Sequence, residues 1–175
     1  MNEKEYFKKR NKLEVKHFLM VKSWKDYCQP TSVLDCGCGM GHYSFVWAWL
    51  NVPVMAFDKS NYVVKNNAYQ KLKIQKGEIT KFKAKGFDLV TAIDILEHID
   101  YKDLDKSIKN IYNATKNYAV FHIPYKDNSN IDLDLTHKIK ESNGWWIKKI
   151  KKAGFKIKKT PKYWMFSGST LIGKK

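Results

Sequence analysis

Short runs of apolar and β-branched residues alternate along the chain with longer segments in which apolar side chains recur every three or four positions. The short runs predict strands and the longer segments predict helices. The predicted strands are 32–36, 53–57, 73–76, 87–93, 118–123, 155–159 and 164–172. The predicted helices are 3–28, 42–51, 61–72, 101–114 and 144–153. This alternation predicts an α/β fold with a seven-stranded, mostly parallel sheet and helices on both faces.

The last two predicted strands are joined by a short link that contains Pro161. Such a link is too short for a helical crossover, so these strands are expected to pair antiparallel, which makes the last strand of the sheet antiparallel. The length of 175 residues fits a single domain. Within it we expect residues 1–31 to form an N-terminal helix that packs on the core, which comprises residues 32–175.

The first predicted strand ends in a glycine-rich turn, Asp35-Cys-Gly-Cys-Gly-Met-Gly41. Ligands of open α/β sheets bind at the carboxyl ends of strands, and glycines allow positive φ and a close approach of the backbone. The carboxylate of Asp35, just before the first glycine, favours a cationic ligand over a pyrophosphate. A dinucleotide fingerprint needs its third glycine where this chain has His42, so NAD fits less well.

Acidic residues also follow the second and third predicted strands. Asp58 is placed where a carboxylate accepts hydrogen bonds from both hydroxyls of an adenosine ribose, although strand-end aspartates also serve as helix caps. Glu78 is placed to accept from an adenine amino group, and Ile79 to cover the ring. These positions predict a nucleoside ligand at the same edge of the sheet as the glycine turn.

Together these residues resemble the class I, seven-stranded family of S-adenosylmethionine-dependent methyltransferases, from about residue 32 to the C-terminus. The segment 87–99, and Trp146 followed by Ala153-Gly-Phe155, are also similar to that family. The resemblance implies S-adenosylmethionine as the cofactor, with Asp94 near its methionine end. The cofactor-binding residues that it implies are Asp35, Gly37, Cys38, Gly39, Gly41, Asp58, Lys59, Glu78, Ile79 and Asp94.

One departure from the family concerns the acceptor. Members that methylate the amino groups of bases often carry an Asn- or Asp-Pro-Pro-aromatic motif after the fourth strand, where this chain has Asp94-Ile-Leu-Glu97. The similar segment His122-Ile-Pro-Tyr125 follows the fifth predicted strand instead, so that role is not transferred to it.

Three histidines are candidate catalytic bases. Methyl transfer is an in-line displacement at a cationic carbon, so positioning supplies much of the catalysis, and a base is needed only if the acceptor loses a proton. The candidates are His137, His98 and His122. His137 ranks first because it lies in the long loop 124–141, and long loops in compact domains are often lids or binding elements. Packing roles remain open for His98 and His122.

The formal net charge of +16 leaves a nucleic-acid partner possible, because basic surfaces gain affinity by releasing counterions. Arg10 is the only arginine, however, and arginine is the better reader of guanine edges and phosphates. The leading hypothesis is methyl transfer to an unidentified acceptor, with a small molecule slightly favoured over RNA, DNA or protein. The alternative is a basic nucleic-acid-binding module that keeps the fold without turnover.

The cysteines Cys28, Cys36 and Cys38 are interpreted as reduced thiols, since a disulfide between the two in the tight turn would be strained. No fourth ligand is placed near them, so no metal site is predicted. The longest apolar stretch, Phe45 to Leu50, is too short to span a bilayer, and the N-terminus lacks a secretory signal. We therefore expect a cytoplasmic protein without a membrane partner, and the sequence favours no oligomeric state.

Overall fold

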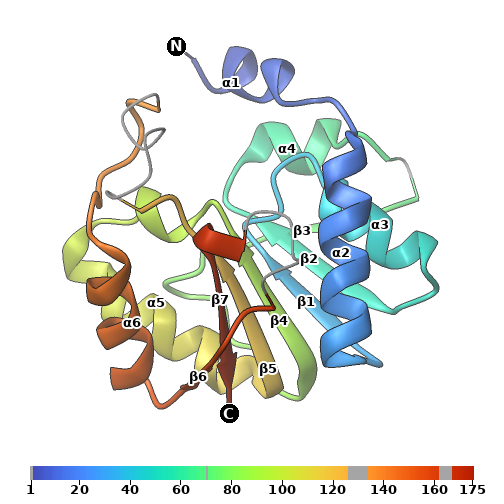
Figure 1. Cartoon of the computed structure of the whole chain (residues 1–175). Coiled ribbons are helices and arrows are strands. Elements are labelled where there is room, and N and C mark those ends of the chain that lie inside the picture. The colour runs from blue at the N-terminus through green and yellow to red at the C-terminus, as the bar shows by residue number, and fades with distance from the viewer. Residues whose placement is uncertain (1, 70, 126–133, 162–166) are drawn as a thin grey trace.

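Seven strands form one sheet in a computed structural model that describes residues 2–69, 71–125, 134–161 and 167–175 (Figure 1). The strands are β1 (Val33–Cys36), β2 (Val54–Asp58), β3 (Ile74–Lys76), β4 (Phe87–Ile93), β5 (Thr115–His122), β6 (Lys156–Lys158) and β7 (Thr170–Lys174). The helices are α1 (Glu3–Lys9), α2 (Val15–Cys28), α3 (His42–Trp49), α4 (Asn61–Asn66), α5 (Tyr101–Ala114) and α6 (Asn143–Lys152), with short 3-10 turns η1 (Leu96–His98) and η3 (Ser167–Ser169).

The strand order is β3-β2-β1-β4-β5-β7-β6. The first five of these strands are mutually parallel, whereas β7 pairs antiparallel with both β5 and β6. The predicted sheet with its antiparallel last strand is thereby confirmed. Because the chain runs outward from β1 to one side and then crosses to β4 on the other, the order reverses between β1 and β4. In open sheets this reversal is where ligands bind, at the carboxyl ends of the strands.

Each face of the sheet carries its own hydrophobic core, because successive side chains of a strand point to opposite faces. Val33, Leu89 and Val120 pack with the buried residues of α2 and α3. Their neighbours one position later, Leu34, Val90 and Phe121, pack with α5 and α6. Figure 1 shows the two helix pairs on opposite sides of the strands. The prediction of helices on both faces is therefore confirmed.

The single helix predicted for residues 3–28 is wrong, because the structure has two helices there. A continuous helix would bond the Arg10 carbonyl to the Glu14 amide. The Arg10 carbonyl instead accepts from His42 Nε2 at 2.8 Å, and the Glu14 amide donates to His17 Nδ1 at 2.9 Å. Two histidine rings thus replace the helical hydrogen bond. The division into residues 1–31 and 32–175 stays a prediction.

Other boundaries shift by a few residues. The helix predicted for 61–72 ends at Asn66, because the Asn67 side chain accepts from the Tyr69 amide at 3.0 Å and so closes a local turn instead. The strand predicted for 164–172 begins at Thr170, and residues 162–166 lie outside the described part of the chain. None of the described helices is long and apolar enough to cross a membrane.

Asp88, near the start of β4, connects neighbouring segments at the edge of the sheet where the parallel strands begin. Its carboxylate accepts from the Thr31 amide at 3.1 Å and from the Thr31 hydroxyl. It also accepts from Asn117 Nδ2 and lies beside the Lys116 ammonium, both at 3.2 Å. The hydrogen bond from Thr31, helped by Lys116, holds the pKa of Asp88 below its usual value.

We expect Asp88→Asn to lower the free energy of unfolding by about 2 kcal/mol at pH 7, because hydrogen bonds to a charged acceptor are lost. A carboxylate with a depressed pKa stabilises the fold above its unfolded pKa and loses that contribution as pH falls through the folded value. The difference in the free energy of unfolding between variant and parent should therefore shrink toward pH 3. Urea unfolding across pH measures it. Asp26→Asn, at an exposed ion pair with Lys22, is the control and should cost less than about 0.5 kcal/mol.

Candidate active site

The glycine turn after β1 adopts the backbone conformation that its sequence predicts. Gly37, Gly39 and Gly41 have φ values of +65°, +53° and +86°. The amide of Gly37 donates to the Phe57 carbonyl at 2.9 Å, which holds the turn against the end of β2. The turn therefore lies at the carboxyl edge of the sheet, where the strand order reverses.

Asp58 ends β2 with its carboxylate against this turn. One oxygen accepts from the Gly39 amide at 3.0 Å and the other from the Ser60 amide at 2.8 Å. The residue is largely buried, and burial raises the pKa of its carboxyl group. The structure therefore places Asp58 against the glycine turn, and its predicted role toward the ribose of the cofactor stays a prediction.

Asp35 lies beneath the turn and is only 1% exposed. Its carboxylate accepts from the Ser44 hydroxyl of α3 at 2.5 Å and from the Thr91 hydroxyl of β4 at 2.8 Å. Burial raises the pKa of Asp35. In this arrangement the side chain joins β1, α3 and β4 below the turn, so any electrostatic effect on a ligand acts through the turn.

The remaining predicted cofactor residues near β2 and β3 have diverse surroundings. Cys38 is partly buried, and Lys59 is exposed. Glu78 forms an ion pair with Lys81 at 2.8 Å, and the hydrogen bond from that lysine lowers the pKa of Glu78. Ile79 is 7% exposed and belongs to the core between the sheet and α5. Glu78 therefore lies at the surface, whereas Ile79 is buried in the core.

Helix α1 lies over the glycine turn. Phe7 packs in a cluster with Cys38, Met40 and Tyr62, and its ring stacks on Tyr62 at a centroid distance of 6.2 Å. A Cβ atom on Gly39 would stand 3.9 Å from Phe7. Figure 1 shows α1 beyond the end of the sheet where the parallel strands finish, near α4. The N-terminal segment therefore covers this edge.

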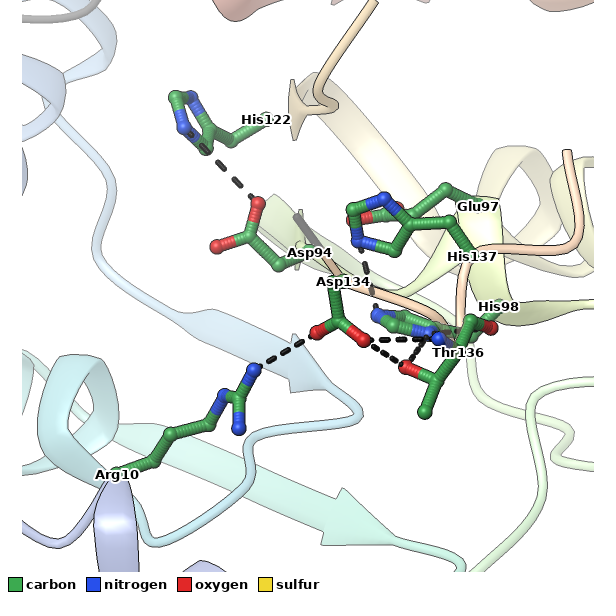
Figure 2. Close-up of polar contacts among 8 residues, drawn as sticks. All are labelled: Arg10, Asp94, Glu97, His98, His122, Asp134, Thr136 and His137. Carbon is green, nitrogen blue, oxygen red and sulfur yellow. Dashed lines mark hydrogen bonds and ion pairs between the residues drawn. The ribbon is translucent and has the colours of Figure 1, made fainter. Parts of the chain in front are cut away.

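The end of β4 carries Asp94 in a left-handed conformation, with φ of +48°. Its amide donates to the His122 carbonyl at 2.9 Å, and its half-exposed carboxylate lies 4.0 Å from His122 Nε2 (Figure 2). His122 Nδ1 bonds to the Thr170 hydroxyl at 3.0 Å. Burial lowers the pKa of His122, which keeps the imidazole neutral and able to accept a proton at neutral pH.

A second group of polar side chains surrounds Glu97 in η1, three residues after Asp94. Its carboxylate is completely buried, and Oε1 lies 3.9 Å from Nε2 of both His98 and His137. The Glu97 carbonyl accepts from the amides of Lys138 and Ile139 at 2.8 and 3.0 Å, which holds the segment carrying His137 against η1. Burial raises the pKa of Glu97 well above its usual range and lowers that of His98.

A polar chain connects the N-terminal segment to this group, as Figure 2 shows. Arg10 Nη2 lies 2.7 Å from Asp134 Oδ2. Asp134 Oδ1 accepts from the Thr136 hydroxyl at 2.5 Å, and that hydroxyl lies 3.0 Å from His98 Nδ1. A series of polar contacts therefore connects Arg10 to His98, one of the candidate catalytic histidines.

The three predicted catalytic histidines fall into two places. The rings of His98 and His137 meet edge to face beside Glu97, with centroids 4.8 Å apart, while His122 lies beside Asp94 (Figure 2). Sequence reasoning missed Glu97, Arg10 and Asp134. The available signal was a glutamate directly before one candidate histidine, with another candidate in the long loop. The catalytic roles of the three histidines stay predictions.

A family model described as a methyltransferase domain matches residues 34–129, more than half of the chain. The chain belongs to this family. This confirms the predicted enzyme class, an S-adenosylmethionine-dependent methyltransferase, and with it the predicted cofactor. No curated protein sequence matches the chain.

Solved methyltransferase structures share the fold. A SAM-dependent methyltransferase from Archaeoglobus fulgidus has a TM-score of 0.72 at 17% identity, over 99% of this chain and 100% of that chain. A 1,6-didemethyltoxoflavin-N1-methyltransferase from Burkholderia thailandensis gives 0.70 at 11%, over 93% and 79%. Magnesium protoporphyrin IX methyltransferase from Synechocystis PCC 6803 gives 0.67 at 19%, over 91% and 79%. These matches confirm the predicted fold class.

Proposed function

We propose that this methyltransferase acts on a small-molecule acceptor that binds at the carboxyl edge of the sheet, beside the end of β4. One observation supports the position of the cofactor in this proposal. The Asp58 carboxylate lies 3.0 Å from the Gly39 amide, in a turn whose glycines all have positive φ. A carboxylate at this place is suited to the two hydroxyls of an adenosine ribose.

Each of the other predicted residues takes a part in this proposal. The methionine portion of the cofactor lies along the turn from Gly37 to Gly41, with Asp94 near its end. Asp35 supports the turn from below through Ser44 and Thr91. The adenine lies beside Glu78 and Ile79, and Cys38 and Lys59 flank the nucleoside.

The small-molecule acceptor is favoured by the absence of an inserted recognition domain between the strands of the described chain. Two structural neighbours are named for small molecules, 1,6-didemethyltoxoflavin and magnesium protoporphyrin IX. Burial lowers the pKa of His122, so its imidazole is neutral near pH 7 and able to take a proton from an acceptor. His98 is the second candidate base. His137 is the third candidate base.

The proposal is tested with S-adenosylmethionine labelled in its methyl group. The purified protein is incubated with a cell extract separated into small metabolites, RNA, DNA and protein. We expect the label to enter the small-metabolite fraction, and the same incubation with Asp58→Ala to leave that fraction unlabelled. Label confined to RNA, DNA or protein would refute the small-molecule acceptor while leaving methyl transfer intact.

The alternative, a nucleic-acid-binding module without turnover, draws on the lysines of residues 4–25 and 148–162. Two of those lysines, Lys149 and Lys152, form ion pairs with Asp105 at 2.8 and 2.9 Å, which reduces their availability to phosphates. This alternative predicts salt-sensitive RNA or duplex binding with no methyl incorporation in any fraction. The labelling experiment therefore separates the two functions.

A further inference from the structure

Glu97 is the one acidic residue in the described part of the chain whose buried side-chain oxygens both lack a hydrogen-bond partner. Its side chain is 0% exposed, and neither oxygen has a hydrogen-bond partner among the described residues. Buried polar groups are normally hydrogen-bonded, because losing water without a replacement partner is costly. Both oxygens therefore have unused capacity to bind a ligand.

Two imidazole nitrogens face this carboxylate. Nε2 of His98 and Nε2 of His137 each lie 3.9 Å from Glu97 Oε1, and one ligand atom from each of the three residues falls within 4.8 Å of the other two. Bonds from zinc to nitrogen and oxygen are about 2.0–2.2 Å long, which separates neighbouring ligands by roughly 3.3 Å. The three side chains would need to move inward by only about half an ångström to surround an ion.

The orientation of His98 suits a metal ligand. Its Nδ1 lies 3.2 Å from the Thr136 carbonyl, which only accepts hydrogen bonds, so this nitrogen carries the proton of the neutral ring. The lone pair is then on Nε2, the atom that faces Glu97. Histidine ligands in metalloproteins are held in this way, by a hydrogen bond from the ring nitrogen that does not bind the metal.

Hydrogen bonds also hold the segment that carries His137 beside Glu97. Glu97 binds it directly, because its carbonyl accepts from the amides of Lys138 and Ile139. Within the segment the Thr136 amide donates to Asp134 Oδ1, and Arg10 donates to the same aspartate from the N-terminal part of the chain. Figure 2 shows His137 and His98 converging with Glu97 from two different segments of the chain.

We propose that Glu97, His98 and His137 form a binding site for a divalent transition-metal ion, with Zn²⁺ or Mn²⁺ as the best candidates. Two imidazoles and one carboxylate suit Zn²⁺, and the carboxylate together with water in the open positions suits Mn²⁺, whereas Mg²⁺ and Ca²⁺ prefer oxygen ligands throughout. The sequence analysis predicts no metal site, because it considers only the three cysteines as possible ligands. Three protein ligands leave coordination positions for water. If the proposed function holds, an acceptor oxygen takes one of these positions, and His122 remains the candidate base because His98 and His137 bind the metal. This consequence rests on that function.

The site is tested with untagged protein that has been stripped of metal with EDTA and then dialysed. Isothermal titration with ZnCl₂ and, separately, MnCl₂ should give one bound ion per chain for at least one of them. Glu97→Gln, which keeps the side-chain shape, and His137→Ala should each weaken that binding by about 100-fold or more. Thr136→Val, which removes only the hydroxyl beside His98 Nδ1, should weaken it by about tenfold or less.

His17→Gln is the matched control, since His17 lies on α2 against His42 and Tyr43, and it should bind the ion as the parent does. Circular dichroism establishes that each variant is folded. A folded parent that binds neither ion, or a Glu97→Gln variant that binds as tightly as the parent, overturns the metal site. S-adenosylhomocysteine binding, titrated in EDTA, is independent of that result, and its failure would count against the proposed function instead.

Discussion

Replacing Asp58 with alanine is expected to weaken binding of S-adenosylhomocysteine by about 100-fold or more. Hydrogen bonds to a charged acceptor contribute about 1.5–3 kcal/mol each, and each 1.4 kcal/mol changes a dissociation constant tenfold. Loss of two such bonds to the ribose hydroxyls therefore exceeds 100-fold. Isothermal titration of parent and variant measures the difference directly, without any need to know the methyl acceptor.

The same carboxylate also accepts from the Gly39 and Ser60 amides, so the variant must be shown to be folded. Asp58→Asn is the conservative comparison, because its amide keeps one accepting oxygen, and it should bind with intermediate affinity. Asp26→Asn, at the exposed end of α2, controls for the loss of one negative charge. Unchanged affinity in folded Asp58→Ala would show that the nucleoside binds elsewhere.

The strands were predictable because buried parallel strands are nearly continuous apolar runs. Phe87–Ile93 is buried on both faces along most of its length, and its sequence contains no competing helical period. The break between α1 and α2 was not predictable, because it depends on tertiary contacts. The rings of His42 and His17 take the two backbone groups that would otherwise continue the helix, and no local pattern near Arg10 announces this.

The candidate site divides in the same way. The glycines of the turn and Asp58 were predictable, because positive φ and strand-end position follow from residue type and local order. Glu97 was not, since a glutamate in the turn after a strand gives no sign that its side chain will be fully buried. The contact between Arg10 and Asp134 joins residues 124 positions apart, so it depends on how α1 and the segment around His137 meet in the fold.

The glycines also differ in what surrounds them, which allows backbone strain and crowding to be separated. A Cβ atom on Gly37 would lie 2.0 Å from Ile95 Cδ1, whereas one on Gly86 would meet nothing within 4 Å. Both residues have positive φ, +65° and +84°. Alanine at either position therefore has a similar conformational cost, about 1–2 kcal/mol, and only Gly37 adds a steric one.

We expect Gly37→Ala to lower the free energy of unfolding by about 2–5 kcal/mol, against about 1–2 kcal/mol for Gly86→Ala, since overpacking adds about 1–3 kcal/mol. Urea unfolding of both variants measures the difference. Adding Ile95→Val removes the Cδ1 atom and should restore part of the stability lost in Gly37→Ala, which a double-mutant cycle reports as coupling. Equal costs at the two glycines, with no coupling to Ile95, would mean that the turn does not pack against the end of β4 as the structure has it. Because that packing sets the glycine turn beside Asp94, the cofactor site would then need a different geometry.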